Sequence, residues 1–194
     1  MSDLVKIESV EALSHAWARF DRYVISYRRR DGRRERLVRE VHDHGHGAAV
    51  LPFDPERHTV LLVRQFRLPA YLFDGDGHII EACAGLLDGN DPADCARREA
   101  EEELGFAVRN LRRMASVYST PGAVTERLTL FLADYSPADR QGDGGGHAHE
   151  GEDIEVLELP LDDARRLARD GGIVDAKTVL LLMYLERERG LPPL

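Results

Sequence analysis

The sequence predicts an α/β protein in which a small antiparallel β-sheet precedes a larger domain of strands and helices. Residues 4–42 are rich in aromatic and β-branched residues, and Asp31-Gly32 within them is typical of a hairpin turn. After them, short apolar runs alternate with helical patterns up to about residue 189. We therefore expect a β-sheet over residues 1–44 and an α/β domain over residues 45–194.

The composition is that of a globular protein and argues against several classes of partner. The 194 residues carry a formal net charge of −9, which disfavours non-specific binding to nucleic acid, so an anionic substrate needs local cations. No apolar run approaches the ~20 residues of a membrane span, and the first residues do not form a secretory signal. Cys83 and Cys95 fit no zinc spacing, so we expect reduced thiols and a cytoplasmic location.

The amino-terminal part is expected to form strands at residues 17–27 and 36–41. A sheet of two or three strands has little core of its own, so it must pack either on a partner subunit or on the rest of the chain. His42, His44 and His46 alternate as metal ligands on a strand face do. Glycines interrupt that strand and no cysteine or carboxylate completes a site, so we interpret the histidines as part of a polar connection.

In the larger part, we expect strands at residues 47–53, 58–66, 78–84, 115–118, 128–135 and 154–159, with helices at 161–169 and 175–189. Residues 68–77 and 136–152 are expected to be loops, and the second is long enough to be a lid, or else disordered. Arg67 ends a strand as either a surface charge or a phosphate contact. Lys177 opposes the dipole of the last helix, which fits either a ligand-facing role or an ordinary surface lysine.

Residues 84–106 combine a glycine-containing turn with a short helix. Asp91 is a suitable N-cap, Pro92 suits the first helical position, and Gly105 is expected to end the helix in a left-handed conformation. Helical spacing brings several carboxylates to one side, those of Glu99, Glu102 and Glu103. Such a group is either a solvated acidic face or a site for a hard cation such as Mg²⁺.

The spacing around these carboxylates carries a family resemblance. R-E-A-E-E-E-L-G-F at residues 98–106 resembles the second half of the Nudix box, and Gly85 followed by Asp91 resembles the first half. The usual glutamate is Asp91, and the spacer from it to Arg98 is one residue short. The chain is identified as a member of the Nudix hydrolase superfamily. T-P-G-A-V-T-E at residues 120–126 resembles the branch that cleaves nucleoside diphosphate sugars.

Four further stretches resemble the bacterial GDP-mannose pyrophosphatase family, which shares the shortened spacer: V-R-Q-F-R (63–67), E-A-C-A-G-L-L-D (81–88), E-D-I-E-V-L-E-L-P (152–160) and K-T-V-L-L-L (177–182). The resemblance implies an α/β/α Nudix sandwich with a mixed sheet. It also implies dependence on Mg²⁺, with Mn²⁺ as a substitute, and a domain-swapped homodimer. In that dimer the amino-terminal sheet contributes residues to the partner's site. We expect neither nucleic acid nor a membrane as a partner.

The resemblance also implies roles for individual residues. The metal ligands would be the Ala84 carbonyl, Glu99, Glu103 and Glu152, with Glu102 for a further ion and Arg98 holding the carboxylates in place. Substrate-contacting positions would be Arg67, Ala84, Gly85, Leu86, Glu103, Glu126, Gly151, Glu152 and Lys177. The other subunit would supply Trp17, Val38, Arg39 and Glu40. Trp17 stands where the family has a tyrosine that stacks on the base, and Val38 replaces a lysine.

The expected reaction is metal-dependent hydrolysis of the pyrophosphate bond of a nucleoside diphosphate sugar. GDP-mannose, giving GMP and mannose 1-phosphate, is the expected substrate, and ADP-ribose or another ADP-sugar is the alternative. Glu99, Glu103, Glu152 and Arg98 are the expected catalytic residues. Two alternatives remain for the proton of the attacking water. Either Glu152 accepts it as the general base, or a metal-bound hydroxide attacks and no general base is needed. A nucleotide-binding module without turnover is disfavoured because the box carboxylates are all present.

Overall fold

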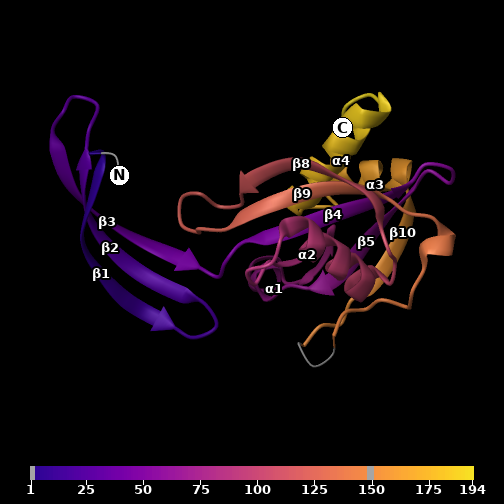
Figure 1. Cartoon of the computed structure of the whole chain (residues 1–194), viewed down its shortest axis with the longest axis horizontal. Helices are drawn as coiled ribbons and strands as arrows, with labels where there is room; N and C mark the ends of the chain where they lie inside the picture. Colours follow the sequence, from indigo (N-terminus) through magenta and orange to yellow (C-terminus); the bar gives the residue numbers. More distant parts are fainter. Residues whose placement is uncertain (1–2, 148–150) are drawn as a thin grey trace. The chain divides into compact units, whose positions relative to one another are not determined.

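The computed structural model describes residues 3–147 and 151–194 (Figure 1). The chain separates into two compact units. Unit 1 comprises the residues up to His46 together with Tyr118–Arg127, and unit 2 comprises Gly47–Val117 and Leu128–Leu194.

Unit 1 is a three-stranded antiparallel sheet in the order β1-β2-β3, formed by Val5–His15, Arg19–Arg28 and Arg34–Asp43. The predicted hairpin joins β2 to β3: the Arg29 N–H donates to the Arg33 carbonyl at 2.8 Å, and Gly32 has φ +85°. Trp17 lies in the turn between β1 and β2, so the strand predicted to begin at residue 17 begins two residues later, at Arg19. β1 is a third strand, for which the sequence analysis gave no separate range.

The sheet of unit 1 has almost no apolar core. Among the described residues of its three strands, only Asp21 is buried, and it pairs with Arg19 and with His15. Apolar side chains such as Ile7 and Val38 are exposed. The predicted turn at residues 120–126 is fastened to the end of β3, where the His42 N–H donates to the Ala123 carbonyl at 2.8 Å.

Unit 2 is built on a seven-stranded sheet in the order β10-β5-β4-β9-β8, with β6 on β5 and β7 on β4. β4 runs parallel to β9 and antiparallel to β5 and β7, so the sheet is mixed as predicted. The strands are β4 Gly47–Asp54, β5 Thr59–Phe66, β6 His78–Glu81, β7 Cys83–Leu86, β8 Arg109–Tyr118, β9 Arg127–Asp134 and β10 Glu155–Pro160. The helices are α1 Leu68–Asp74, α2 Pro92–Glu99, η1 Ala100–Leu104, η2 Pro137–Asp139, α3 Leu161–Arg169 and α4 Ala176–Arg189.

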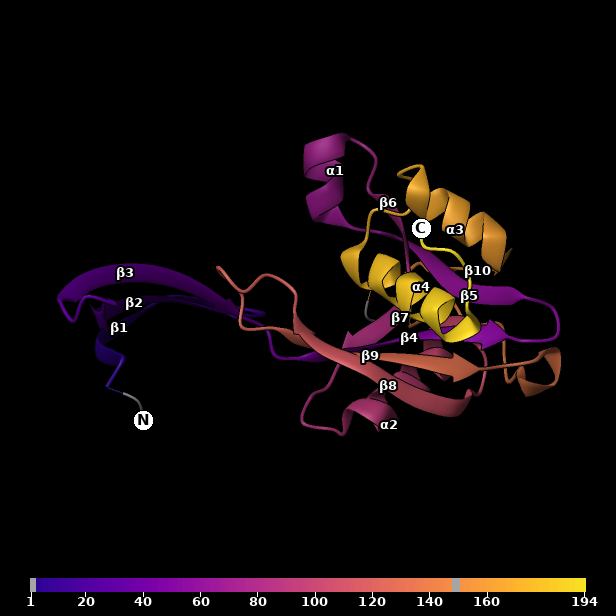
Figure 2. The same cartoon turned by 90° about the horizontal axis from the view of Figure 1, so that it is seen from above.

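The central strand β4 shows how the layers form. All eight of its residues are buried, and alternate side chains point to opposite faces of the sheet. Ala48 and Val50 belong to one core cluster with residues of α2, whereas Leu51 and Phe53 belong to the other cluster with residues of α3 and α4. Figure 2 shows α2 on one side of the strands and α3 and α4 on the other. The predicted α/β/α sandwich is confirmed.

Two local predictions were wrong. Residues 68–77 were expected to form a loop, but they contain α1, which ends at Gly75 in a left-handed conformation with φ +82°. α1 has no buried residue, and its Phe73 is 91% exposed, so no apolar stripe marked it as a helix. The strand expected at residues 78–84 is two strands, because β6 pairs with β5 and β7 pairs with β4.

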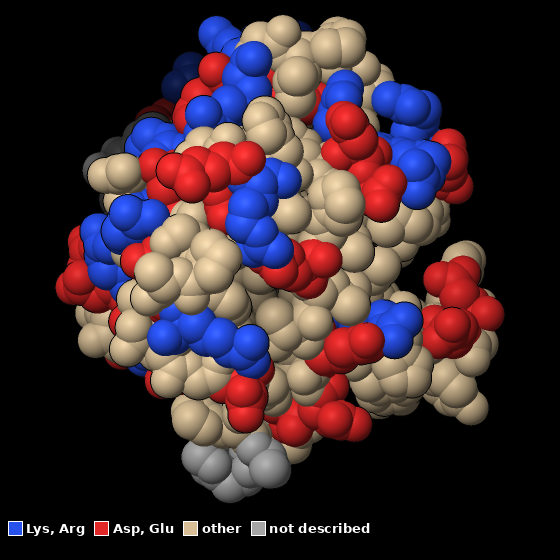
Figure 3. Space-filling model, turned by 90° about the vertical axis from the view of Figure 1, so that its right-hand side faces the viewer, with Lys and Arg blue, Asp and Glu red and all other residues tan. Residues whose placement is uncertain are grey.

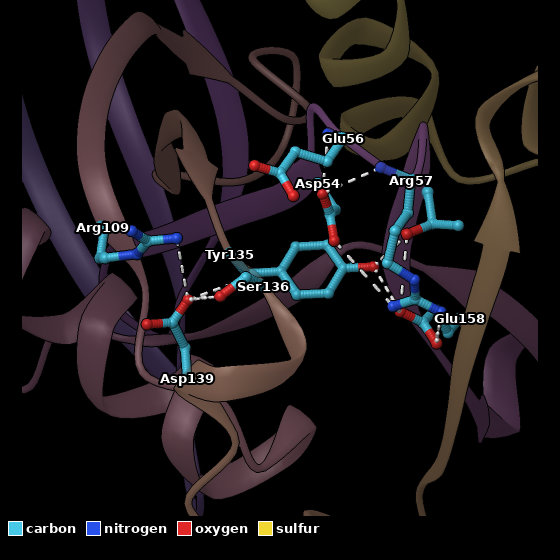
Figure 4. Close-up of polar contacts among 9 residues, drawn as sticks. Asp54, Glu56, Arg57, Arg109, Tyr135, Ser136, Asp139 and Glu158 are labelled. Carbon is cyan, nitrogen blue, oxygen red and sulfur yellow. Dashed lines mark hydrogen bonds and ion pairs between the residues drawn. The ribbon is translucent and has the colours of Figure 1, made fainter.

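The long segment that follows β9, residues 136–152, is anchored to unit 2 at its first residues (Figure 4). Tyr135 is fully buried, and its hydroxyl lies 2.8 Å from Glu158 and 2.6 Å from Thr59. Next to it, the N–H of Ser136 donates to the carboxylate of Asp139 at 2.8 Å, and Arg109 pairs with the same carboxylate at 3.0 Å. The first residues of the segment are therefore held on the body of unit 2.

Candidate active site

The helix that carries the carboxylates begins and ends where the sequence predicts. The Asp91 side chain accepts the Ala93 N–H at 2.8 Å, Pro92 occupies the first position, and Gly105 ends the helix with φ +77°. The last turn differs from the prediction. η1 is a π-helix, a wider turn that occurs mostly as a local insertion and often at functional sites. Glu102 and Glu103 lie on this wider turn.

Glu103 is the most buried of these carboxylates. Its Oε2 accepts the backbone N–H of Ala84 at 3.2 Å, which ties the helix to β7. Burial, with the negative charges of Glu99 and Glu152 nearby, raises the pKa of Glu103 to about 7. A cation placed among these groups would favour the ionised form.

Glu99 lies against the backbone of β7. A Cβ atom on Gly85 would come within 2.1 Å of Glu99 Oε1, so a glycine at this position is what allows the carboxylate to lie there. Arg98 Nη2 donates to the same oxygen at 2.6 Å. Burial raises the pKa of Glu99, and the charge of Arg98 opposes this effect.

Arg98 also contacts the remaining carboxylate of the helix. Its Nε lies 3.7 Å from Glu102 Oε2, and its Nη2 lies 3.4 Å from the Leu86 carbonyl. Arg98 therefore bridges two neighbouring carboxylates and the end of β7. This is the geometry of a residue that keeps like charges together.

Glu152 reaches the same region from the long segment. Its Oε2 accepts the His147 N–H at 2.7 Å, and a Cβ atom on Gly146 would come within 2.3 Å of this oxygen. The N–H groups of Gly145 and Gly146 donate to the carbonyls of Glu103 at 2.8 Å and Glu102 at 3.2 Å. The described part of the segment is thus bonded to the end of the carboxylate helix. Of the predicted lid, residues 148–150 lie outside the described residues.

The carboxylates fit a hard divalent cation by their chemistry. Across residues 3–147 and 151–194, no three His, Cys, Asp or Glu side chains stand close enough together to hold a metal ion as they lie. The carboxylates of Glu99, Glu103 and Glu152 are instead turned to protein donors on Arg98, Ala84 and His147, respectively. Oxygen ligands of this kind are those that Mg²⁺ uses. Burial and neighbouring negative charges raise the pKa of Glu99 and Glu103, and a bound cation would oppose this shift by favouring the ionised carboxylates.

Arg67 and Lys177 both pair with Glu81, a residue to which the sequence analysis assigned no role. Arg67 Nε and Lys177 Nζ lie 2.7 Å and 2.5 Å from its carboxylate oxygens. Lys177 also pairs with Asp175 at 3.1 Å. In the sequence, Glu81 appeared only as the first residue of the stretch 81–88 and in the middle of the strand predicted at residues 78–84.

The remaining predicted residues divide between the units. Leu86 and Gly151 belong to unit 2, and Gly151 is exposed with φ +80°. Unit 1 contains Trp17, Val38, Arg39, Glu40 and Glu126. Trp17 is 77% exposed, and its ring stacks on His44 with 5.6 Å between centroids. The structure describes each unit by itself, so the roles of these residues at the carboxylates stay predictions.

The surface and the cysteines add little to the choice of function. On the face seen in Figure 3, basic and acidic side chains are interspersed. Both cysteines are free and buried. Within the described residues, no helix has the length and apolar character needed to cross a membrane.

Comparison with known proteins identifies the family. The NUDIX domain model matches residues 43–182, and the model of the GDP-mannose pyrophosphatase NudK N-terminal domain matches residues 4–42. The chain belongs to the Nudix family, as its box residues predicted.

Its curated relatives narrow the position within the family. A GDP-mannose pyrophosphatase of Pectobacterium atrosepticum is 44% identical over 185 residues, covering 95% of both chains. Another, of Salmonella arizonae, is 49% identical over 158 residues, covering 81% of this chain and 82% of that one. A solved structure described as an ADP compounds hydrolase superposes with a TM-score of 0.71 at 19% identity, covering 95% of this chain and 93% of that one. That likeness bears on the fold alone, and it agrees with the sandwich described above.

Proposed function

We propose that this protein is a Mg²⁺-dependent hydrolase that cleaves the pyrophosphate bond of GDP-mannose into GMP and mannose 1-phosphate. The observation that carries the proposal is the position of the Glu99 and Glu103 carboxylates against the backbone of Gly85 and Ala84, with the negative charge of Glu152 acting on both. The choice of GDP-mannose is supported by curated relatives of that activity at 41–49% identity.

In the proposed mechanism, Glu99, Glu103 and Glu152 would hold a divalent cation, with the Ala84 carbonyl as a further ligand. When bound, the cation would neutralise charge at the diphosphate and lower the pKa of the attacking water. Arg98 keeps the carboxylate of Glu99 ionised and oriented through its hydrogen bond.

Other residues act on the substrate and on the proton. Arg67 provides positive charge and donors for the diphosphate oxygens. Glu152, released from the His147 N–H, accepts the proton of the water that attacks phosphorus. Gly85 leaves room for the carboxylate beside the substrate, because it has no side chain.

A competition between two substrates tests the identity of the nucleotide sugar. Purified protein with Mg²⁺ is given GDP-mannose or ADP-ribose, and the products are resolved by chromatography. We expect GMP and mannose 1-phosphate, with a clearly higher kcat/KM for GDP-mannose. A preference for ADP-ribose would keep the reaction class and overturn the proposed substrate.

Two matched variants test the role of the carboxylates. Glu103→Gln removes a buried carboxylate of η1, whereas Glu101→Gln removes an exposed carboxylate of the same turn. We expect Glu103→Gln to lower kcat at least ~100-fold, since it removes a ligand of the cation, and Glu101→Gln to leave kcat within about twofold. Equal activity of the two variants would overturn the assignment.

We further propose a homodimer in which the sheet of unit 1 lends Trp17 to the partner's site. Two observations support this: the sheet lacks a core of its own, and Trp17 is exposed beside a hollow of about 440 Å³ lined by residues 15–19 and 43–45. Light scattering tests the dimer. Mixing equal amounts of Trp17→Ala and Glu103→Gln after reversible dissociation tests the exchange. About half of the re-formed dimers are then heterodimers with one intact site of two, so the mixture should regain about a quarter of the wild-type activity. No recovery would overturn the exchange. The cytoplasmic location stays a prediction.

A further inference from the structure

Glu81 joins three distant parts of unit 2. It ends β6, and only 4% of its surface is exposed. Its carboxylate accepts from Arg67 Nε at 2.7 Å and Arg67 Nη2 at 3.1 Å, which is a two-pronged contact, and from Lys177 Nζ at 2.5 Å. Arg67 directly follows β5, and Lys177 lies in the first turn of α4. One carboxylate therefore fixes cations from two other elements.

Arg67 and Lys177 differ in whether they can still bind an anionic ligand. The Arg67 side chain is 44% exposed, and Glu81 takes only one edge of its guanidinium group. A guanidinium group has five N–H donors, so the other edge can still meet an anion. The Lys177 side chain is 11% exposed and is held between Glu81 and Asp175. Lys177 is therefore a fixed charge behind Glu81, and Arg67 is the group that can reach a ligand.

We propose that Glu81 is a positioning residue that orients the Arg67 guanidinium for the diphosphate of the substrate, with Lys177 locking Glu81 from behind. The proposal rests on the proposed function, since it takes the diphosphate of a nucleotide sugar as the ligand. A free arginine side chain loses much conformational freedom when it binds an anion. Glu81 removes that freedom before the substrate arrives, so less affinity is lost on binding.

A purely structural role for Glu81 predicts something different. In that case its loss would lower stability, and any effect on activity would be independent of Arg67. If Glu81 acts through Arg67, its loss matters only while Arg67 is present. A double-mutant cycle separates these two cases.

The experiment measures KM and kcat for GDP-mannose in Glu81→Gln, Arg67→Ala and the double variant, with thermal unfolding of each. We expect Glu81→Gln to raise KM about 10-fold, because Arg67 must then be ordered by the substrate itself, and to leave kcat within about threefold. In the Arg67→Ala background, the same substitution should change KM less than twofold. Glu81→Asp keeps the charge but shortens its reach, so its KM should lie between those of wild type and Glu81→Gln.

Glu188→Gln is the matched control. Glu188 makes the same two-pronged contact with Arg112, at 3.2 Å to Nε and 3.0 Å to Nη2, but neither residue belongs to the site. We expect an unchanged KM. An unchanged KM in Glu81→Gln, or an equal rise with and without Arg67, would overturn the positioning role. If Glu81→Gln does not fold, the same cycle is measured with Glu81→Asp.

Calorimetric titration with GDP and Mg²⁺ separates this proposal from the proposed function. Failure of the wild-type protein to hydrolyse GDP-mannose would overturn that function. Coupling between Glu81 and Arg67 in the Kd for GDP would still support the positioning role. Absence of that coupling in GDP binding, as in KM, would overturn it.

Discussion

Replacing Gly85 by alanine would put a methyl carbon into space that the Glu99 carboxylate occupies. The added Cβ would lie 2.1 Å from Oε1, 2.2 Å from Cδ and 2.7 Å from Oε2 of Glu99. Ordinary van der Waals contact begins at 3.4 Å, so the carboxylate must retreat by about 1.3 Å. Because only the end of a flexible side chain has to move, we expect a loss of stability of about 1 kcal/mol, at the low end of the cost of overpacking.

The effect on catalysis should be much larger than the effect on stability. A displacement of about 1 Å in a group that orients reacting partners costs roughly 100-fold in rate. We therefore expect Gly85→Ala to lower kcat for GDP-mannose about 100-fold and to weaken activation by Mg²⁺. The assay is chromatographic detection of GMP over a range of Mg²⁺ concentrations, with unfolding monitored in parallel.

Gly142→Ala is the control for the added methyl group. A Cβ atom on Gly142 meets nothing within 4 Å, so its kcat should stay near that of wild type. A kcat for Gly85→Ala within twofold of wild type would refute the argument, since Glu99 would then not need its position against β7. A large loss of stability with normal activity would refute it as well.

Three further predictions concern charge, capping and the long segment. Glu103 has a pKa of about 7 in the folded protein against 4.5 ordinarily, so the folded state binds the proton more tightly. In metal-free protein, this group should therefore add roughly 3 kcal/mol to the free energy of unfolding below pH ~4.5. That contribution should be lost as the pH rises past 7. Urea unfolding at several pH values should show this, with a flatter profile in Glu103→Gln and a smaller loss when Mg²⁺ is added. Asp91→Ala removes the cap on the Ala93 N–H and should cost about 1 kcal/mol in the same measurement, whereas an unchanged midpoint would argue against the cap. Gly146→Ala puts a Cβ within 2.3 Å of Glu152 Oε2 and should lower kcat at least tenfold, by the same argument from displaced catalytic groups; normal turnover would mean that Glu152 works from another position.

Local rules of sequence predicted the ends of the carboxylate helix correctly. Asp91 and Gly105 act through their own backbone and their immediate neighbours, so their effect can be seen in a short stretch of sequence. The π-turn between them could not be predicted in this way. It coincides with bonds from the N–H groups of Gly145 and Gly146 to carbonyls of the turn, and these donors lie about 40 residues further along the chain.

The candidate site shows the same division. The box spacing predicted Glu99 and Glu103 as metal ligands from one short segment. Glu81 was missed because its meaning depends on Arg67, 14 residues away, and on Lys177, 96 residues away. No periodic pattern links such positions. A carboxylate at the end of an apolar strand becomes informative only when the fold brings two cations to it.

α1 was missed for a different reason. Apolar periodicity predicts a helix when one face of the helix is buried, and α1 buries no residue. Its signals were Pro69 near the start and Gly75 at the end, and both are equally common in loops.

The long sequence separation of the contacts at Glu81 has a consequence for the order in which the protein matures. Lys177 belongs to α4 and is synthesised 96 residues after Glu81, and contacts between distant parts of a chain form late because a large loop must close first. During synthesis, the carboxylate helix can form before α4 exists, whereas Arg67 and Glu81 still lack the lysine that completes their cluster. A nascent chain would therefore hold its acidic groups before it holds its complete set of fixed positive charges. Competence to bind a diphosphate would arise only when α4 docks on the sheet.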